Sequence, residues 1–334
     1  SLEQILPQLA DRRVVFVGEN HDQYSHHLVQ LAIIRGLHRK HGELAIGLEF
    51  FQQPFQEHLD AYVAGAIDET EMLRRTEYME RWGYDYRLYR PILEYAREHR
   101  LPLVALNVPR ELTKRVAEQG MAALGEQERA QLPEIDRGNA RYRERLRTLY
   151  EAHPARKGGS FENFVEAQLL WDEGMAQRAA EYLAQHPGRR MVILAGAGHV
   201  AWRDGIPRRL DRRMALSAAV VLSGAQESLS PEVADFVLLP APAELPPKGM
   251  MGVLMETAEK GVRVTRFTES SAAQEAGVQQ NDCIVRIDEA AVDDATDVQL
   301  ALLTRKPGEV VKVGVLREAG TAQEQLLQYQ VQLR

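Results

Sequence analysis

The sequence predicts an α/β protein: a mainly parallel sheet with helices on both faces and a helical insertion, followed by a small β-rich domain. Two observations lead to this fold class. Short, almost continuously apolar runs alternate with long amphipathic segments over the first two-thirds of the chain. A proline-rich run at 240–247 then precedes a stretch of short strand-like segments. We therefore expect an N-terminal domain at 1–239, a semi-rigid linker at 240–247 and a second domain at 248–334.

Five apolar runs are the expected strands of the N-terminal domain. Polar residues do not alternate with apolar ones along them, which is typical of strands buried on both faces. Amphipathic segments such as 26–41 and 54–64 lie between the runs, and this alternation favours parallel pairing. The long segment Glu111–Gln185 is expected to be an entirely helical insertion. The five runs are Val14–Gly18, Leu44–Phe51, Leu101–Val108, Met191–Gly196 and Met214–Leu222.

The composition excludes several classes of protein. A formal net charge of -7 argues against general nucleic-acid binding, which needs a strongly basic face. Cys283 is the single cysteine, so an internal disulfide is impossible, and its apolar neighbours predict a buried core residue. The apolar runs are too short for a transmembrane helix. Because the chain begins at Ser1 rather than Met, it is compatible with the removal of a signal or lipid-anchor segment.

Ionisable side chains stand at the carboxyl ends of three expected strands. The motif GENH contributes Glu19 and His21 after the first run, GLEFF carries Glu49 in the second, and GAGH contributes His199 after the fourth. Ligands of open α/β sheets bind in the crevice at these strand ends. The glycines beside these residues allow close backbone approach and sharp turns. The sequence therefore predicts one polar pocket that contains all four side chains.

Three further residues are expected to line or support this pocket. Asn107 stands at the end of the third run. Gln168 and Asp172 are four residues apart, so they share one face of a helix. From that face they are expected to hydrogen-bond the histidine and glutamate groups at the strand ends.

Six motifs of the N-terminal part occur in an order that resembles the ChaN-like proteins. These motifs are GENHDQYSHHLVQ, GLEFFQQPFQEHLDAYVAG, WGYDYRLYRP, LVALNVPRE, FVEAQLLWDEGMA and LAGAGHV. The resemblance covers about 12–224. ChaN-like proteins are bacterial, iron-regulated, haem-binding proteins, often lipoproteins, in a superfamily with the Tiki metalloproteases and the erythromycin esterases. The resemblance implies an α/β fold and a role in haem handling.

Haem needs an axial ligand, apolar walls and cations for its propionates. The helical insertion offers residues of these types. Tyr142, Tyr150 and His153 are the candidate axial ligands, and the sequence does not choose between them. Arg141 and Arg145 are candidate partners of the propionates.

A hydrolase is the alternative for the same pocket, because the superfamily also contains hydrolytic enzymes. Glu19, His21, Glu49 and His199 would then act as general base or bind a divalent metal such as Zn or Mn.

The last part of the chain resembles the PDZ domains of bacterial HtrA-type proteases. The segments that carry this resemblance are KGMMGV, GVRVTRF, SSAAQEAGV, QNDCIVRIDEAAV, DATDVQLALL and GEVVKVGVLR. A glycine-bracketed loop with free backbone N–H groups is a natural cradle for the carboxylate of a peptide C-terminus. The residues expected to bind the peptide are Gly249, Met250, Met251, Gly252, Val253, Leu300 and Leu303.

The two resemblances also imply partners and a location. The expected partners are haem and the C-terminus of a peptide or protein, with a homodimer as a further expectation. By analogy with envelope proteins, we expect a bacterial periplasmic or outer-membrane-associated lipoprotein. A third hypothesis is a scaffold protein in which only the PDZ groove is functional.

Overall fold

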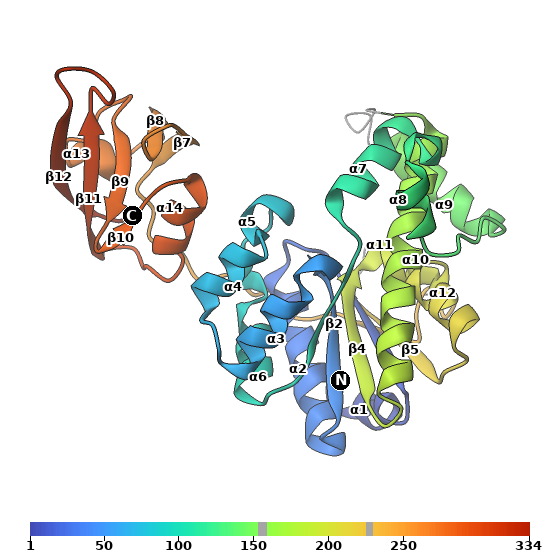
Figure 1. Ribbon diagram of the computed structural model, residues 1–334. Helices are drawn as coiled ribbons and strands as arrows, with labels where there is room; N and C mark the ends of the chain where they lie inside the picture. Colours follow the sequence, from blue (N-terminus) through green and yellow to red (C-terminus); the bar gives the residue numbers. More distant parts are fainter. Residues whose placement is uncertain (153–158, 225–229) are drawn as a thin grey trace. The chain divides into compact units, whose positions relative to one another are not determined.

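The computed structural model describes residues 1–152, 159–224 and 230–334. The chain forms two compact units, Ser1–Glu244 and Leu245–Arg334, and the division falls inside the proline-rich run (Figure 1). Within the described residues, no helix is both long enough and apolar enough to cross a bilayer.

The N-terminal unit is built on a six-stranded sheet with the order β3-β2-β4-β1-β5-β6. All of its strand pairs are parallel, which confirms the predicted fold class. Five strands correspond to the five predicted runs, and β6 is a short addition at the edge that the sequence did not suggest. The strands are β1 (Val14–Glu19), β2 (Leu44–Gln52), β3 (Leu103–Asn107), β4 (Arg190–Gly196), β5 (Ala218–Ser223) and β6 (Phe236–Leu238).

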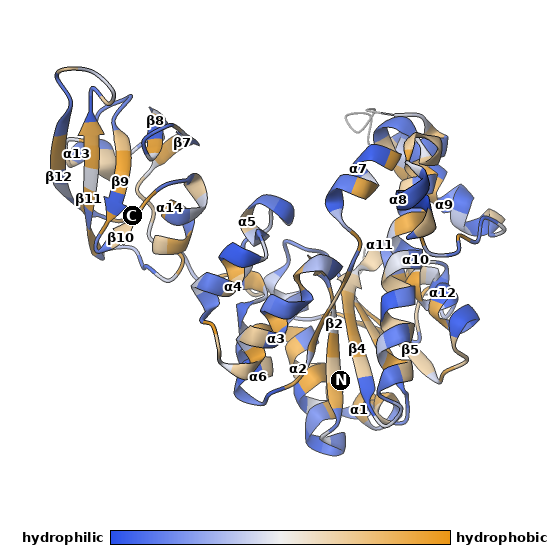
Figure 2. Cartoon of the chain, viewed as in Figure 1, coloured by the Kyte–Doolittle hydropathy of each residue, from blue (hydrophilic) through white to orange (hydrophobic). Residues whose placement is uncertain are grey.

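Helices pack on both faces of this sheet, and the hydrophobic colouring in Figure 2 concentrates in the strands between them. Strands β1, β2 and β3 are completely buried, as continuously apolar runs require. Local signals set several helix starts, such as Pro91 in the first turn of α6 and the cap that Ser160 provides to Asn163 N in α10. The helices before the insertion are α1 (Leu2–Ala10), α2 (Tyr24–His41), α3 (Gln56–Ala64), α4 (Glu69–Arg75), α5 (Tyr78–Arg81) and α6 (Arg90–Glu98).

The insertion is helical in most of its length, but the expectation of an entirely helical segment was wrong. Residues 131–139 have no regular structure, because Pro133 and Gly138 interrupt the helical pattern. The helices of the insertion are α7 (Arg110–Gln119), α8 (Glu126–Ala130), α9 (Ala140–Ala152) and α10 (Phe161–Gln185). After β4 follow α11 (Ala197–Val200) and α12 (Ile206–Arg213).

The C-terminal unit is an antiparallel sheet with the order β12-β11-β9-β8-β7, and β10 pairs with β9. Strand β7 therefore lies at one edge of the sheet. A separate core of valines and isoleucines fills this unit, and Cys283 is buried as predicted. The elements are β7 (Val253–Thr257), β8 (Val262–Phe267), α13 (Ala272–Glu275), β9 (Cys283–Ile287), β10 (Ala290–Ala291), α14 (Ala295–Ala301), β11 (Val310–Arg317) and β12 (Gln325–Gln332).

Candidate functional site

The structure brings the four strand-end side chains together. Glu19 is the last residue of β1 and lies beside Gly196, the last residue of β4. A Cβ atom on Gly196 would lie 2.9 Å from His21 Cε1 and 3.7 Å from Glu49 Oε2, so these two side chains meet over that glycine. His199 Nε2 lies 3.4 Å from Glu49 Oε1. The small residue at position 196 is thus a steric requirement of the pocket.

Glu19 and His21 form the first histidine–carboxylate pair of the site. His21 Nδ1 lies 2.6 Å from Glu19 Oε1. Burial opposes protonation of His21, but the hydrogen bond to Glu19 and the nearby charge of Glu49 outweigh it and raise the pKa of His21. The other carboxylate oxygen of Glu19, Oε2, is buried and has no hydrogen-bond partner among the described residues. This oxygen is an unsatisfied acceptor directly beside the imidazole.

His199 lies between two carboxylates, those of Glu49 and Asp172. Its Nδ1 is 2.6 Å from Asp172 Oδ1, and Asp172 is fully buried. Burial lowers the pKa of His199, but the charges of Glu49 and Asp172 overcome this effect and raise it to about 9. His199 is therefore an imidazolium at neutral pH.

The supporting residues that the sequence suggested have different roles. Asp172 does hydrogen-bond a strand-end histidine, as expected. Asn107 donates from Nδ2 to the backbone oxygen of Glu49 at 2.9 Å, so it holds the strand rather than the carboxylate. The carboxylate of Glu49 accepts instead from the backbone N–H of Gly196 at 2.6 Å. Gln168 is half-buried on α10, one turn before Asp172, and makes no side-chain hydrogen bond to the site in the described part of the chain.

Aromatic rings flank His21. The ring centroids of Trp82 and Tyr84 both lie 4.8 Å from the centroid of its imidazole. Trp82 is fixed by a hydrogen bond from Nε1 to the hydroxyl of Tyr89 at 3.0 Å. Tyr84 is 40% exposed, so this aromatic wall reaches the surface. The pocket therefore offers flat apolar surface beside its imidazole.

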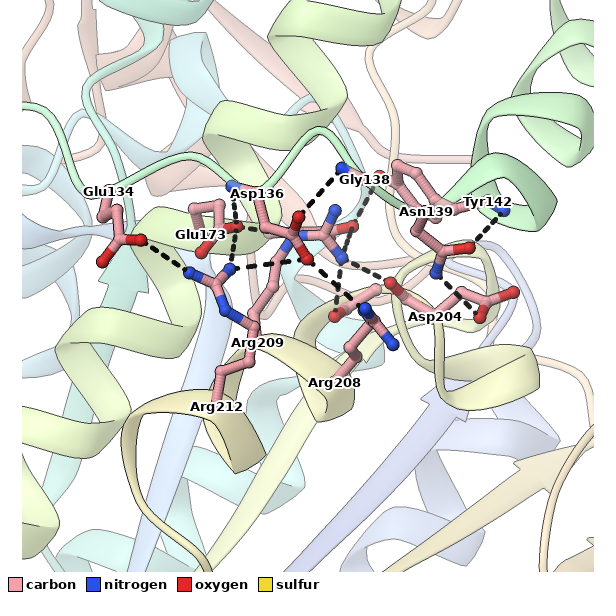
Figure 3. A network of polar contacts seen from close by, with 12 residues as sticks. Glu134, Asp136, Gly138, Asn139, Tyr142, Glu173, Asp204, Arg208, Arg209 and Arg212 are labelled. Atoms are coloured by element: carbon pink, nitrogen blue, oxygen red, sulfur yellow. Dashed lines mark hydrogen bonds and ion pairs between the residues drawn. The ribbon is translucent and has the colours of Figure 1, made fainter.

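Asp172, the partner of His199, belongs to a network of polar contacts with Tyr142 and Arg209. Figure 3 shows the part of this network around Tyr142, Glu173 and Arg209. The hydroxyl of Tyr142 donates to Asp172 Oδ2 at 2.6 Å, and the guanidinium of Arg209 lies 4.6 Å from the centroid of the Tyr142 ring. Arg209 is almost fully buried, and its Nε is 3.4 Å from the fully buried Glu173. Sequence reasoning missed Arg209 and Glu173. A signal was available, because the basic run RRLDRR and the second acid of the WDEG motif are unusual in helices that pack on a sheet.

The candidate haem ligands lie in different environments. Tyr142 is buried, and this burial together with the charge of Asp172 raises the pKa of its phenol well above the usual value. In this structure the hydroxyl of Tyr142 is engaged as a donor to Asp172. Tyr150 is only partly buried, and its hydroxyl donates to Gly159 O at 2.9 Å. His153 lies outside the described residues.

The two candidate propionate partners also differ. Arg141 is held by both oxygens of Asp204, at 3.1 and 3.0 Å, so its charge is already neutralised. Arg145 donates from Nη1 to Gly198 O at 3.2 Å, which places it beside the loop of His199. Its Nε and Nη2 are buried and lack hydrogen-bond partners within the part of the chain that the structure describes. Arg145 therefore retains buried donors for an anion, whereas the Nε and Nη2 donors of Arg141 are already used.

The metal alternative is not supported. Among the residues that the structure describes, no group of three or more His, Cys, Asp or Glu side chains has an arrangement that could hold a metal ion. The carboxylates of the pocket form hydrogen bonds with imidazoles and with a backbone N–H group instead.

The C-terminal unit has a second candidate site along the edge strand β7. Gly249 N and Met250 N donate to Arg305 O and Arg334 O, both at 2.8 Å. The N–H groups of Met251 and Gly252 have no acceptor within the described residues. Gly252 has a φ of 74°, and a Cβ there would lie 2.8 Å from Ser271 Cα. These two N–H groups lie immediately before the open edge of the sheet.

The apolar residues predicted for this groove lie partly in the core of the unit. Met250 is 47% exposed, and Val253 is partly buried at the start of β7. Met251, Leu300 and Leu303 are buried. Helix α14, which carries Leu300, is tied to β7 by a bond from Ala295 N to Thr257 Oγ1 at 3.2 Å.

Together these features define a class: an α/β domain with histidine–carboxylate pairs at its strand ends, joined to a PDZ domain. Residues 5–210 match the family described as "Haem-binding uptake, Tiki superfamily, ChaN", and the chain belongs to this family. Residues 249–326 match the PDZ domain family.

Two known proteins illustrate the relationship of the N-terminal domain. A solved structure, "Cofacial heme binding to ChaN of Campylobacter jejuni", is 19% identical and covers 72% of this chain and 92% of that one, with a TM-score of 0.59. The chloroplastic protein RETICULATA-RELATED 5 of Arabidopsis thaliana is 25% identical over 66% of this chain. That match spans 32% of the length of the plant protein.

Proposed function

We propose that the N-terminal domain binds haem and that the PDZ domain captures the carboxyl terminus of a peptide or protein. The observation that carries the first part is the family match at 5–210, which includes every residue of the strand-end site. The ChaN protein of Campylobacter jejuni, which shares this fold, binds haem cofacially. A role in bacterial iron or haem uptake follows from this proposal.

The residues around the site fit a haem group. The unbonded Nε and Nη2 of Arg145 suit a propionate, because a buried donor without a partner in the described part of the chain gains most from an anionic acceptor. Tyr150 is the partly accessible candidate for the axial ligand, and the rings of Phe161 and Phe164 lie 5.5 and 5.4 Å from its own. Bound haem supplies iron and a strong visible absorption band.

Titration with hemin tests this proposal. We expect the wild type to produce a Soret band distinct from that of free hemin. Tyr150→Phe should change the position of the band, and Arg145→Gln should weaken binding by about 10-fold or more. Tyr182 lies near the C-terminal end of α10, whereas Tyr150 lies in α9. Tyr182→Phe is the matched control and should behave as the wild type. A free-hemin spectrum with the wild type would contradict the proposal.

The PDZ part of the proposal rests on the N–H groups of Met251 and Gly252 beside the open edge of β7. A terminal carboxylate would accept from these groups, and the peptide would extend the sheet as an added strand. A C-terminal peptide library should yield binders that lose affinity when their carboxylate is amidated. Enrichment of internal sequences that tolerate amidation would contradict capture of a terminus.

The hydrolase hypothesis gains no comparable support. His199 is protonated at neutral pH, which makes it a poor general base. The location in a bacterial envelope, the lipid anchor and the homodimer stay predictions. Fractionation of cells that produce the full-length protein, with detergent extraction of the membranes, tests the location and the anchor together.

A further inference from the structure

A second cleft lies in the N-terminal unit beside α10 and α7, which pack against one another (Figure 1). Its volume is about 510 Å³, within the range of small-molecule sites in proteins. Glu128 and the segment 131–133 form one wall, and Gln53 and Val108, which directly follow β2 and β3, contribute to another.

The cleft faces away from the strand-end site. Gly174 and Arg178 line it, whereas Asp172 on the same helix points toward His199. Residues two positions apart lie on different sides of a helix. The cleft is therefore lined by a different side of α10 from the one that carries Asp172.

Part of the floor and part of the wall of the cleft are apolar. These parts include Val108, Leu112 and Leu132. Gly174 permits this packing, since a Cβ there would lie 2.2 Å from Val108 Cγ1. The backbone of α10 thus approaches the floor closely and leaves an apolar surface open beside it.

Arg178 supplies a positive charge to the cleft. It forms neither an ion pair nor a hydrogen bond within the described part of the chain, and its Nε is shielded from water. A buried donor left unbonded is unfavourable by about 1–3 kcal/mol. A ligand that supplies an acceptor would remove this penalty.

The three glutamates that line the cleft have partners other than Arg178. Glu111 is paired with Arg81 at 2.8 Å, and Glu128 is paired with Arg115 at 2.6 Å. Glu181 accepts a hydrogen bond from Gln177 at 2.8 Å. Two of the three carboxylates are thus neutralised by arginines outside the cleft, and the guanidinium of Arg178 keeps its capacity for an anion.

We propose that this cleft binds an amphipathic organic acid, with its carboxylate on Arg178 and its apolar body against Val108, Leu112 and Leu132. The guanidinium provides directed donors for a carboxylate, and the apolar floor provides the surface that an alkyl or aryl chain would bury. Neither the family match nor the strand-end geometry assigns a ligand to this cleft.

Isothermal titration of the full chain with decanoate, below its micellar concentration, tests the proposal. Arg178→Gln should weaken binding by about 10-fold or more, because a charge-assisted bond is lost. Leu132→Ser should weaken it as well, since apolar contact is removed. Arg129→Gln is the matched control: this nearby arginine is exposed, does not line the cleft and donates to Ala122 O. Unchanged tryptophan fluorescence in each variant verifies folding.

The cationic amphiphile decyltrimethylammonium separates the head-group preference from general apolar binding. We expect it to bind more weakly than decanoate. Equal or tighter binding of the cation, or equal decanoate affinity of Arg178→Gln and the wild type, would overturn the proposal. Displacement of hemin by decanoate would also overturn the proposal, because it would show that the cleft is not separate from the hemin site. Decanoate binding without an effect on the hemin spectrum supports it, whether or not hemin itself binds.

Discussion

The two candidate sites of this chain are built on opposite principles. In the N-terminal unit, Glu19, Glu49, Asp172 and His199 come from separate elements and meet through side chains. In the PDZ unit, the carboxylate cradle is one continuous segment, 249–253, and its donors are backbone N–H groups. The first site depends on charge balance among buried groups, and the second on backbone geometry at a glycine. Single substitutions and pH should therefore affect the two sites in different ways.

The largest contrast is expected from Asp172→Ala. This change leaves His199, Tyr142 and Arg209 without their shared buried carboxylate. Loss of one partner of a buried charged network destabilises a domain by about 3–5 kcal/mol. All three tryptophans of the chain, Trp82, Trp171 and Trp202, lie in the N-terminal unit, so urea unfolding followed by tryptophan fluorescence reports on this unit alone.

The matched control for Asp172→Ala is Glu181→Ala, which removes an exposed acid from the same helix. It should change the free energy of unfolding by less than about 0.5 kcal/mol. Equal effects of the two substitutions would show that the Asp172 network contributes no special stability.

A rise in pH should weaken the N-terminal unit. The pKa of His199 is raised to about 9 in the folded protein, against an ordinary value of about 6.5 when unfolded. Because the folded protein holds the proton of His199 more tightly than the unfolded chain does, this proton stabilises the folded state. The stabilisation is complete below the pKa of the unfolded chain and is lost as the pH rises through about 9. The expected loss is roughly 3 kcal/mol.

Fluorescence-monitored urea unfolding at pH 6.5 and at pH 9.5 measures this effect. His199→Gln should remove most of the difference between the two conditions. The pKa of His21 is also raised, so deprotonation of His21 lowers stability in the same direction. A small part of the pH effect should therefore remain in His199→Gln. Equal stability of the wild type at both pH values would show that His199 is not held as an imidazolium.

Gly252→Ala should act on the PDZ unit alone, with a smaller effect on stability. The residue has a φ of 74°, and its new Cβ would lie 2.8 Å from Ser271 Cα. We expect a loss of about 1–3 kcal/mol in that unit and peptide binding weakened by about 10-fold or more. The hemin titration should not change.

Gly320→Ala is the control for this substitution, since its φ is 79° and its Cβ would meet no described atom within 4 Å. Gly320→Ala has the same cost of a positive φ as Gly252→Ala, but its Cβ makes no steric clash and the residue lies outside the carboxylate cradle. Peptide affinity that falls equally in both variants would mean that the cradle geometry is not what binds the peptide.

Much of the fold and part of the site could be predicted from the sequence. Apolar runs placed five strands, because strands buried on both faces cannot carry polar residues in the middle. Because the strands are parallel, Glu19, Glu49 and His199 lie together at the carboxyl ends of the strands. The interruption at 131–139 was missed, although Pro133 was visible, because the flanking segments are strongly helical.

The sequence by itself determined the two domains, the strand ends that carry the ionisable residues and the glycine cradle, since these depend on local patterns and on parallel pairing. Only the tertiary structure decided the partner of each side chain. It buried Tyr142 on Asp172, neutralised Arg141 with Asp204 and, within the described residues, left Arg145 and Arg178 with unbonded donors. The physical reason is that protonation and free hydrogen-bonding capacity depend on burial and on neighbours distant in the chain, which a linear pattern does not specify.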